Sequence, residues 1–244
     1  MKTVSNKVGS ISTFSIQNAK YNSIVEKNIL ERIVENMVLI EKGIYLQNKH
    51  DIITFKGKVI RSSKPQEIEM DSFYISKYLI TQKEWVTLMK YDPSKYQVED
   101  EDLPVFNVNY EDCLRFIVKL NRMTGLKFDL PTSLQWDYAA HGGKANNYNL
   151  NSKTYEEICQ HAWVDINTPF PIGLKTPNPI GLYDMFGNVG ELCKRITSKD
   201  IIKGGIIQNE RIWESNGFYH YEEFWDEEKA PDNIGFRLVC NETD

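Results

Sequence analysis

Residues 177–192 read PNPIGLYDMFGNVGEL, a stretch in which glycine, asparagine and proline recur every few positions. These residue types favour tight turns, because glycine and asparagine tolerate positive φ and proline cannot continue a helix. Glycine, asparagine and proline remain frequent from residue 144 to the C-terminus, and apolar runs are short there. This part of the chain is therefore predicted to consist of short strands set among long loops.

Upstream of residue 144 the hydrophobic spacing predicts regular elements. Apolar residues recur at intervals of three and four over 22–36 and 110–124, which indicates two amphipathic helices. Further elements are expected at these positions: strands at 37–40, 44–46 and 73–80, a hairpin around Lys56 and Gly57, and short helices after the capping residues Thr81 and Thr132.

The two halves together indicate one α+β domain, because no low-complexity linker or internal repeat separates them. Residues 1–20 are polar and lack periodicity, so we expect a loose arm there. We assign residues 1–36 to an N-terminal arm and helix, and residues 37–244 to the folded domain.

The charge balance excludes some classes of protein. The chain has 29 Lys and Arg against 34 Asp and Glu, a formal net charge of −5. A nucleic-acid-binding protein would show a basic face, so no nucleic acid is expected as a partner. No apolar run approaches the roughly 18–20 residues that a membrane-spanning helix needs. No apolar signal segment follows the first lysine, so a cytoplasmic location is expected.

Seven stretches form an ordered set: MVLIEKGIYL (37–46), FYISKYLITQKEW (73–85), LPVFNVNYEDCLRF (103–116), FDLPTSLQWDYAAHGG (128–143), PNPIGLYDMFGNVGEL (177–192), IKGG (202–205) and NIGFRLV (233–239). In this order and spacing they resemble the formylglycine-generating enzyme (sulfatase-modifying factor) family over about residues 37–240. The resemblance implies a C-type-lectin-like α+β fold with two helices, a small twisted antiparallel sheet and long loops.

The family's oxidase activity is not expected in this chain. The resemblance implies that the oxidases bind copper(I) through a CxxxxC pair that follows a Gly-Gly turn. The matching positions here are Asn209 and Glu214, and no cysteine lies between Cys193 and Cys240. Because copper(I) prefers soft sulfur ligands, neither replacement serves the same chemistry. The chain is therefore predicted to be a non-catalytic member, a pseudoenzyme, with no copper.

A second branch of the family makes carbon–sulfur bonds at a non-haem iron. It resembles this domain but takes its iron ligands from an additional helical domain. The histidines here are far apart and form no HxxxH or HxH pair: His50, His141, His161 and His220. A metal-dependent oxidase or sulfoxide-synthase-like enzyme with rearranged ligands is kept as the alternative function.

One calcium site of the family is partly preserved. Gly187 to Glu191 match its GNxxE element, so the resemblance implies that Asn188 and Glu191 are structural Ca²⁺ ligands. Hard oxygen donors on a tight loop suit this ion. The alternative is that both side chains hydrogen-bond the loop backbone. A second family site near 167–178 is not expected, because that stretch contains no Asp or Glu.

Residues 208–229, here called the 208–229 segment, combine aromatic and acidic side chains. The segment has six aromatics, seven acids and two bases, so it carries the entire net charge of −5. Aromatic side chains supply large contact area at low entropic cost. The predicted ligand-binding residues are Asn209, Arg211, Trp213, Glu214, Tyr219, His220, Tyr221 and Trp225. The alternative is that about half of the aromatics pack the loops onto the sheet.

The family's fold also includes hypervariable ligand-binding proteins of bacteria and phages, and the 208–229 segment resembles their diversified surface. The favoured function is a non-catalytic binding module for a protein, peptide or glycan ligand, with a basic ligand favoured by the acids. A third hypothesis makes the chain a subunit of a larger assembly that docks through helix 22–36.

Overall fold

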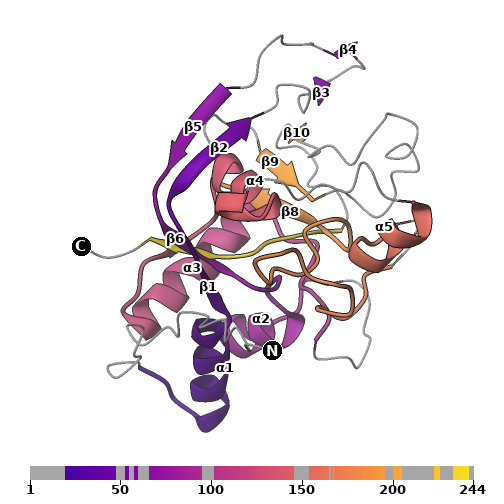
Figure 1. Cartoon of the computed structure of the whole chain (residues 1–244). Helices are drawn as coiled ribbons and strands as arrows, with labels where there is room; N and C mark the ends of the chain where they lie inside the picture. The colour runs from indigo at the N-terminus through magenta and orange to yellow at the C-terminus, as the bar shows by residue number, and fades with distance from the viewer. Residues whose placement is uncertain are drawn as a thin grey trace, which may run out of the picture.

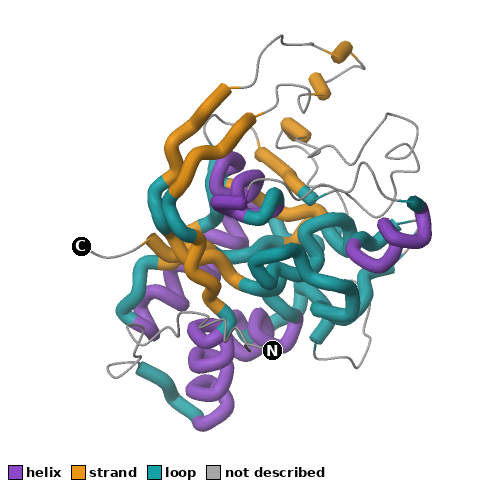
Figure 2. The backbone as a smooth tube through the Cα atoms, viewed as in Figure 1, coloured by secondary structure: helices purple, strands orange, loops and turns teal. Residues whose placement is uncertain are grey.

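The computed structural model describes these residues: 20–47, 53–54, 58–59, 66–94, 102–145, 154–164, 166, 168–195, 200–204, 223–225 and 233–241. Helices and short strands surround a loop-rich centre (Figures 1 and 2). The mixture of helices with small, mainly antiparallel sheets confirms the predicted α+β class.

Five α-helices lie in the described residues: α1 (Ile24–Glu35), α2 (Gln82–Met89), α3 (Tyr110–Thr124), α4 (Ser133–Ala140) and α5 (Tyr155–His161). Four of them lie where the sequence predicts helices, two more than the family resemblance implies. Helix α5 was not predicted, because it buries only Ile158 and shows no apolar stripe. None of the described helices is long and apolar enough to cross a membrane.

Side-chain caps set the beginnings of these helices as the sequence predicts. Thr81 accepts a hydrogen bond from Glu84 N, and Glu84 accepts one from Thr81 N, which completes a capping box. Thr132 forms the same arrangement with Gln135 at the start of α4. Gly125 ends α3 with φ of 77°, a left-handed conformation that favours glycine.

The first sheet joins both ends of the chain. Its order is β1-β6-β12-β7, with all neighbours antiparallel, and the strands are β1 (Met37–Ile40), β6 (Phe73–Ser76), β12 (Val239–Asn241) and β7 (Phe128–Asp129). The predicted strand 73–80 ends at Ser76, because Ile80 N instead donates to Phe236 O and Val105 N to Ile80 O. The chain then turns into the Thr81 cap.

A second sheet holds the C-terminal half. Its order is β10-β9-β8-β11, and the strands are β10 (Glu223–Trp225), β9 (Asp200–Lys203), β8 (Gly190–Cys193) and β11 (Ile234–Gly235). Two ribbons complete the described strands: β2 (Gly43–Gln47) with β5 (Gln66–Met70), and β3 (Ile53–Thr54) with β4 (Lys58–Val59). The second ribbon is the hairpin expected around residues 56–57.

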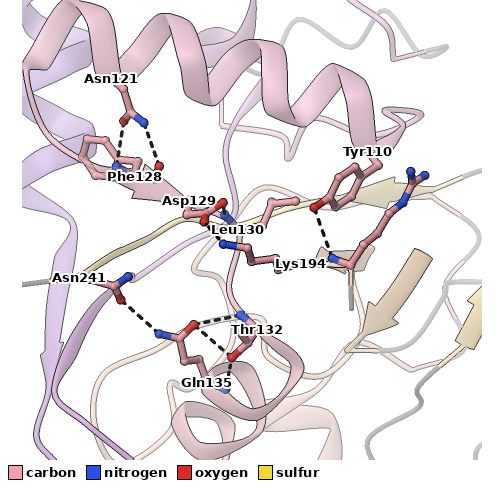
Figure 3. A network of polar contacts seen from close by, with 10 residues as sticks. Tyr110, Asn121, Phe128, Asp129, Leu130, Thr132, Gln135, Lys194 and Asn241 are labelled. Atoms are coloured by element: carbon pink, nitrogen blue, oxygen red, sulfur yellow. Dashed lines mark hydrogen bonds and ion pairs between the residues drawn. The ribbon is translucent and has the colours of Figure 1, made fainter. Parts of the chain in front are cut away.

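Polar contacts fasten α3 and β8 to the strand β7 (Figure 3). Asn121 of α3 donates to Phe128 O at 2.9 Å and accepts from Phe128 N at 2.8 Å. Lys194, directly after β8, lies 2.6 Å from a carboxylate oxygen of Asp129. The Lys194–Asp129 contact thus joins the residue after β8 to β7, the edge strand of the first sheet.

Helix α1 packs into the main hydrophobic cluster with α2 and α3. Its buried face consists of Ile29, Leu30, Ile33 and Val34. Arg32 of the same helix lies 3.4 Å from Glu84 of α2 and 2.7 Å from Asp102. Most of the amphipathic face that the third hypothesis assigns to a partner is therefore covered within this chain, whereas Val25 is 52% exposed.

The pKa of Glu26 predicts a pH-dependent contribution to stability. Its carboxylate accepts hydrogen bonds from the Asn22 amide at 2.7 Å and from Lys90 at 3.0 Å, and these lower its pKa below 4.5. A lowered pKa stabilises the fold above the unfolded-state value, and this contribution is lost as pH falls. Glu26→Gln should therefore lower the free energy of unfolding by about 1 kcal/mol at pH 7.

Chemical denaturation at pH 7 and pH 3 measures this difference, which should become smaller at the lower pH. The control is Glu31→Gln on the same helix, because Glu31 forms only a half-exposed pair with Lys27. A pH-independent loss for Glu26→Gln would show that its charge is not the cause.

Candidate functional site

The predicted ligand-binding residues fall largely outside the described part of the chain: Asn209, Arg211, Trp213, Glu214, Tyr219, His220 and Tyr221. The eighth, Trp225, lies in β10, where its backbone pairs with Asp200 of β9. The roles of these side chains stay predictions. The structure does describe the sheet from which the 208–229 segment leaves and to which it returns.

Three strands of the second sheet hold this segment. Strand β9 ends at Lys203, directly before Gly204, whose φ is +83°. Strand β10, inside the segment, pairs antiparallel with β9. After the segment, β11 pairs in parallel with β8, with Ile234 opposite Gly190. In the described part of the chain, β9 precedes the segment, β11 follows it, and β10 lies within it.

A buried pair of opposite charges lies in the middle of this frame. Arg237 donates from Nε to Glu191 Oε2 at 2.6 Å and from Nη2 to Oε1 at 2.7 Å. Both side chains are fully buried. Trp136 of α4 donates a further hydrogen bond to Glu191 Oε2 at 2.7 Å. The bidentate geometry and the extra donor satisfy both carboxylate oxygens, which such burial requires.

The guanidinium of Arg237 also reaches two backbone carbonyls. Nη1 donates to Ser76 O at 3.2 Å, and Nη2 donates to Tyr183 O at 3.0 Å. Ser76 ends β6 in the first sheet, whereas Tyr183 belongs to the loop before β8. One side chain therefore joins both sheets and the central loop.

A second buried ion pair lies beside the first. Lys203 Nζ is 3.0 Å from Asp137 Oδ2, and both side chains are almost fully buried. Lys203 is the cross-strand partner of Glu191, and Asp137 follows Trp136 on α4. The two pairs form a neutral cluster of four charges, here called the buried charge cluster, which includes Lys203 at the end of β9.

The loop before β8 is held by two polar side chains. Asp184 accepts hydrogen bonds from Trp163 Nε1 at 2.7 Å and from Gly173 N at 2.8 Å. Burial raises the pKa of Asp184 despite these donors. Asn188 accepts from Phe170 N at 2.9 Å and donates to Phe170 O at 3.0 Å. The GNVGE turn is therefore fastened to the loop around residue 170.

Asn188 and Glu191 do not fit a calcium site as the described residues place them. Both oxygens of Glu191 accept from Arg237, whose positive charge opposes a cation, and the Asn188 oxygen accepts from Phe170 N. No group of three His, Cys, Asp or Glu side chains in the described ranges could hold a metal ion. Calcium binding stays a prediction, and isothermal titration of the chelated protein with CaCl₂ tests it.

The cysteines are free thiols within the described part of the chain. Cys113, Cys193 and Cys240 are buried and Cys159 is half-buried. Burial raises the pKa of the Cys240 thiol, which disfavours the thiolate that binds metals. Of the histidines, His141 donates from Nδ1 to Asp137 O at 2.9 Å, and His50 and His220 lie outside the described residues.

Sequence reasoning missed the buried charge cluster. Its signal was present, because Lys203 follows Ile201 and Ile202, and Arg237 stands within Phe-Arg-Leu-Val. A charged residue inside an apolar run is expected to be buried and paired. Its partners, Asp137 and Glu191, lie 66 and 46 residues away along the chain, and no local pattern identifies them.

A comparison with known protein families identifies the family of this chain. A model described as sulfatase-modifying factor enzyme 1-like domain matches residues 21–242. The chain belongs to this family. The match includes α1 together with both sheets, and it confirms the family resemblance noted from the seven stretches.

Similar proteins support the same fold. The chaperone protein LppX of Paenibacillus barcinonensis is 26% identical, over 59% of this chain and 70% of that protein. Treponema denticola variable protein 1 has a TM-score of 0.67 at 20% identity and covers 85% of this chain and 94% of its own. PvdO from Pseudomonas aeruginosa has a TM-score of 0.64 at 20% identity, with coverages of 84% and 94%.

Arg237→Met should lower the free energy of unfolding by about 3–5 kcal/mol, because it leaves the Glu191 carboxylate buried without a cation. The double variant Arg237→Met, Glu191→Leu should recover part of this loss, since it removes both charges. Urea denaturation of the single and double variants measures the coupling.

The matched control is Lys194→Met, which breaks the partly exposed pair with Asp129. It should lower the free energy of unfolding by less than about 1 kcal/mol. A loss of similar size in Arg237→Met and Lys194→Met would contradict the central place of the buried pair.

Gly187→Ala should strongly destabilise the turn before Asn188. Gly187 has φ of +85°, and a Cβ there would collide with Trp163 O. Gly125→Ala is the matched control, because Gly125 has φ of +77° but no atom within 4 Å of such a Cβ. The control should cost about 1 kcal/mol, from φ alone. Thermal unfolding compares them, and equal losses would contradict the predicted collision.

Proposed function

We propose that this chain is a non-catalytic binding module that recognises a polypeptide or glycan ligand through the 208–229 segment. One observation carries the proposal. The segment follows a sheet in which both carboxylate oxygens of the buried Glu191 are hydrogen-bonded, in a chain without the thiol pair of the family's oxidases. A firmly held sheet with an aromatic-rich segment suits binding rather than catalysis.

The buried charge cluster supports a structural role for the centre of the fold. The Glu191 carboxylate accepts three hydrogen bonds, and the Arg237 guanidinium donates to Glu191 and two carbonyls. Groups that are fully hydrogen-bonded and fully buried cannot reach a substrate or exchange protons with it. The Glu191–Arg237 pair therefore stabilises the second sheet, and we assign ligand recognition to the 208–229 segment.

The positions of the thiols argue against the family's copper chemistry. The sequence has no cysteine between Cys193 and Cys240, where the oxidases carry their CxxxxC pair. Both of these thiols are buried in the described structure. Copper(I) needs accessible soft ligands, so a binding role fits these residues better than oxygen-dependent oxidation.

The composition of the 208–229 segment indicates the kind of ligand. Six aromatics provide contact area, and a net charge of −5 favours a basic partner through complementary potential. The relative named as a chaperone makes a polypeptide ligand the first choice, and the neighbour named as a variable protein supports a surface that changes among relatives.

A binding experiment tests the proposal. Basic peptide arrays and glycan arrays identify a ligand, and titration then compares the native chain with the double variant Tyr219→Ala, Tyr221→Ala. Two aromatic contacts at a hot spot cost more than about 1 kcal/mol each, so affinity should fall at least about tenfold. Tyr21→Ala, which truncates an exposed tyrosine at the other end of the chain, is the control.

Unchanged affinity in the double variant would contradict binding through this segment. The alternative enzyme hypothesis has its own measurement, anaerobic loading with iron or copper followed by elemental analysis. Retained metal together with oxygen uptake would contradict the non-catalytic proposal.

A further inference from the structure

A second surface lies on the loop that precedes β8, drawn as thick teal tube beside α5 in Figure 2. Its first component is Lys77, whose Nζ lies 5.2 Å from the ring centroids of both Tyr78 and Tyr183. The two rings lie 5.1 Å apart. The π faces hold the ammonium group by cation–π attraction, which restricts its position.

The second component is Lys175. Its Nζ lies 4.4 Å from the ring centroid of Trp163 and donates a hydrogen bond to Cys159 O. Phe170 stacks on the same indole, with centroids 4.5 Å apart and planes at 11°. An aromatic ring and a backbone carbonyl thus position this ammonium group as well.

Neither lysine has a carboxylate within 4 Å in the described part of the chain. Other lysines do have such partners: Lys27, Lys90, Lys144, Lys194 and Lys203. Two half-buried cations with no carboxylate within this distance retain unused hydrogen-bond donors. An anionic group that approached them would form charge-assisted hydrogen bonds.

The two lysine sites belong to one surface. Gly173 packs closely against Tyr78, because a Cβ at Gly173 would lie 2.8 Å from a carbon of the tyrosine ring. Gly173 N also donates to Asp184, which accepts from Trp163 on its other oxygen. Leu174 stands between Gly173 and Lys175 in the chain, and it is 63% exposed.

The composition of this stretch leaves it apolar and positive. Residues 166–183 contain four prolines and no Asp or Glu. Asp184, which follows, is 2% exposed and lies beneath the loop. Phe170 is 38% exposed and adds to the apolar area of Leu174. The loop therefore presents aliphatic and aromatic atoms in addition to the Lys77 and Lys175 ammonium groups.

We propose that this face, the Lys77–Lys175 surface, binds an acidic peptide with an apolar side chain between its carboxylates. Leu174 and Phe170 supply the apolar contact, and Lys77 and Lys175 pair with the carboxylates. A sugar fits less well, because Trp163 is covered by Phe170 and Lys175 and the described loop exposes no carboxylate to accept from hydroxyl groups.

This surface is distinct from the 208–229 segment and prefers the opposite charge. The proposed function could fail without affecting it, since a basic ligand tests the acidic segment and an acidic peptide tests the lysines. Binding by both would make the chain a bridge between two partners of opposite charge.

Fluorescence anisotropy tests the proposal with a fluorescein-labelled peptide that alternates glutamate and leucine, and with its glutamine counterpart. The native chain should bind only the glutamate peptide, less tightly as salt is raised. Lys77→Met and Lys175→Met should each weaken binding about tenfold. Leu174→Ser, at a highly exposed position that cannot disturb folding, should weaken it about fivefold.

Lys127→Met is the matched control, because Lys127 is an exposed lysine elsewhere, and it should leave the affinity unchanged. Equal binding of the two peptides, an equal loss in Lys127→Met, or no loss in Leu174→Ser would overturn the proposal. Binding of a polyuronate in place of the glutamate peptide would overturn it in favour of an acidic glycan.

Discussion

The buried pair between Glu191 and Arg237 is the interaction on which this fold depends. Removing two charges from water is costly, and only bidentate pairing with all remaining donors and acceptors satisfied offsets that cost. The Glu191–Arg237 pair meets this condition with Trp136 and two backbone carbonyls. Because these partners come from the first sheet, α4 and the central loop, none of these elements can shift alone without breaking a buried hydrogen bond of the pair.

This constraint separates the molecule into a fixed centre and peripheral segments. Lys203 and Asp137 extend the buried charge cluster to the end of β9, a few residues before the 208–229 segment. All four charged residues lie outside the segment, so a change in its composition removes none of these charges. A family with one scaffold and several uses is the expected consequence.

The periphery carries charges of opposite sign in different places. The 208–229 segment accounts for the net charge of −5, whereas the stretch 166–183 has no acid and holds Lys175 over an indole. Aromatic rings contribute differently in each place. Near Lys77 and Lys175 they restrain cations by cation–π contacts, and in the acidic segment we propose that they provide contact area for a ligand.

Local signals in the sequence determined the helices, their caps and the α+β class. Thr81, Thr132 and Gly125 act on residues within one turn, so their spacing alone predicts where α2 and α4 begin and where α3 ends. The absence of a thiol pair is likewise a property of the sequence. The end of β6 at Ser76 was not predictable, because it depends on pairing with distant segments around Phe236 and Val105.

Only the tertiary structure decided what the charged and aromatic side chains do. Glu191 is an oxygen donor in a turn motif when seen in the sequence, but in the fold it is the partner of Arg237, 46 residues away. Lys77 and Lys175 are ordinary basic residues until packing places aromatic rings beside them. The physical reason is range: capping and hydrophobic periodicity act over a few residues, whereas burial and charge pairing depend on which distant segments meet.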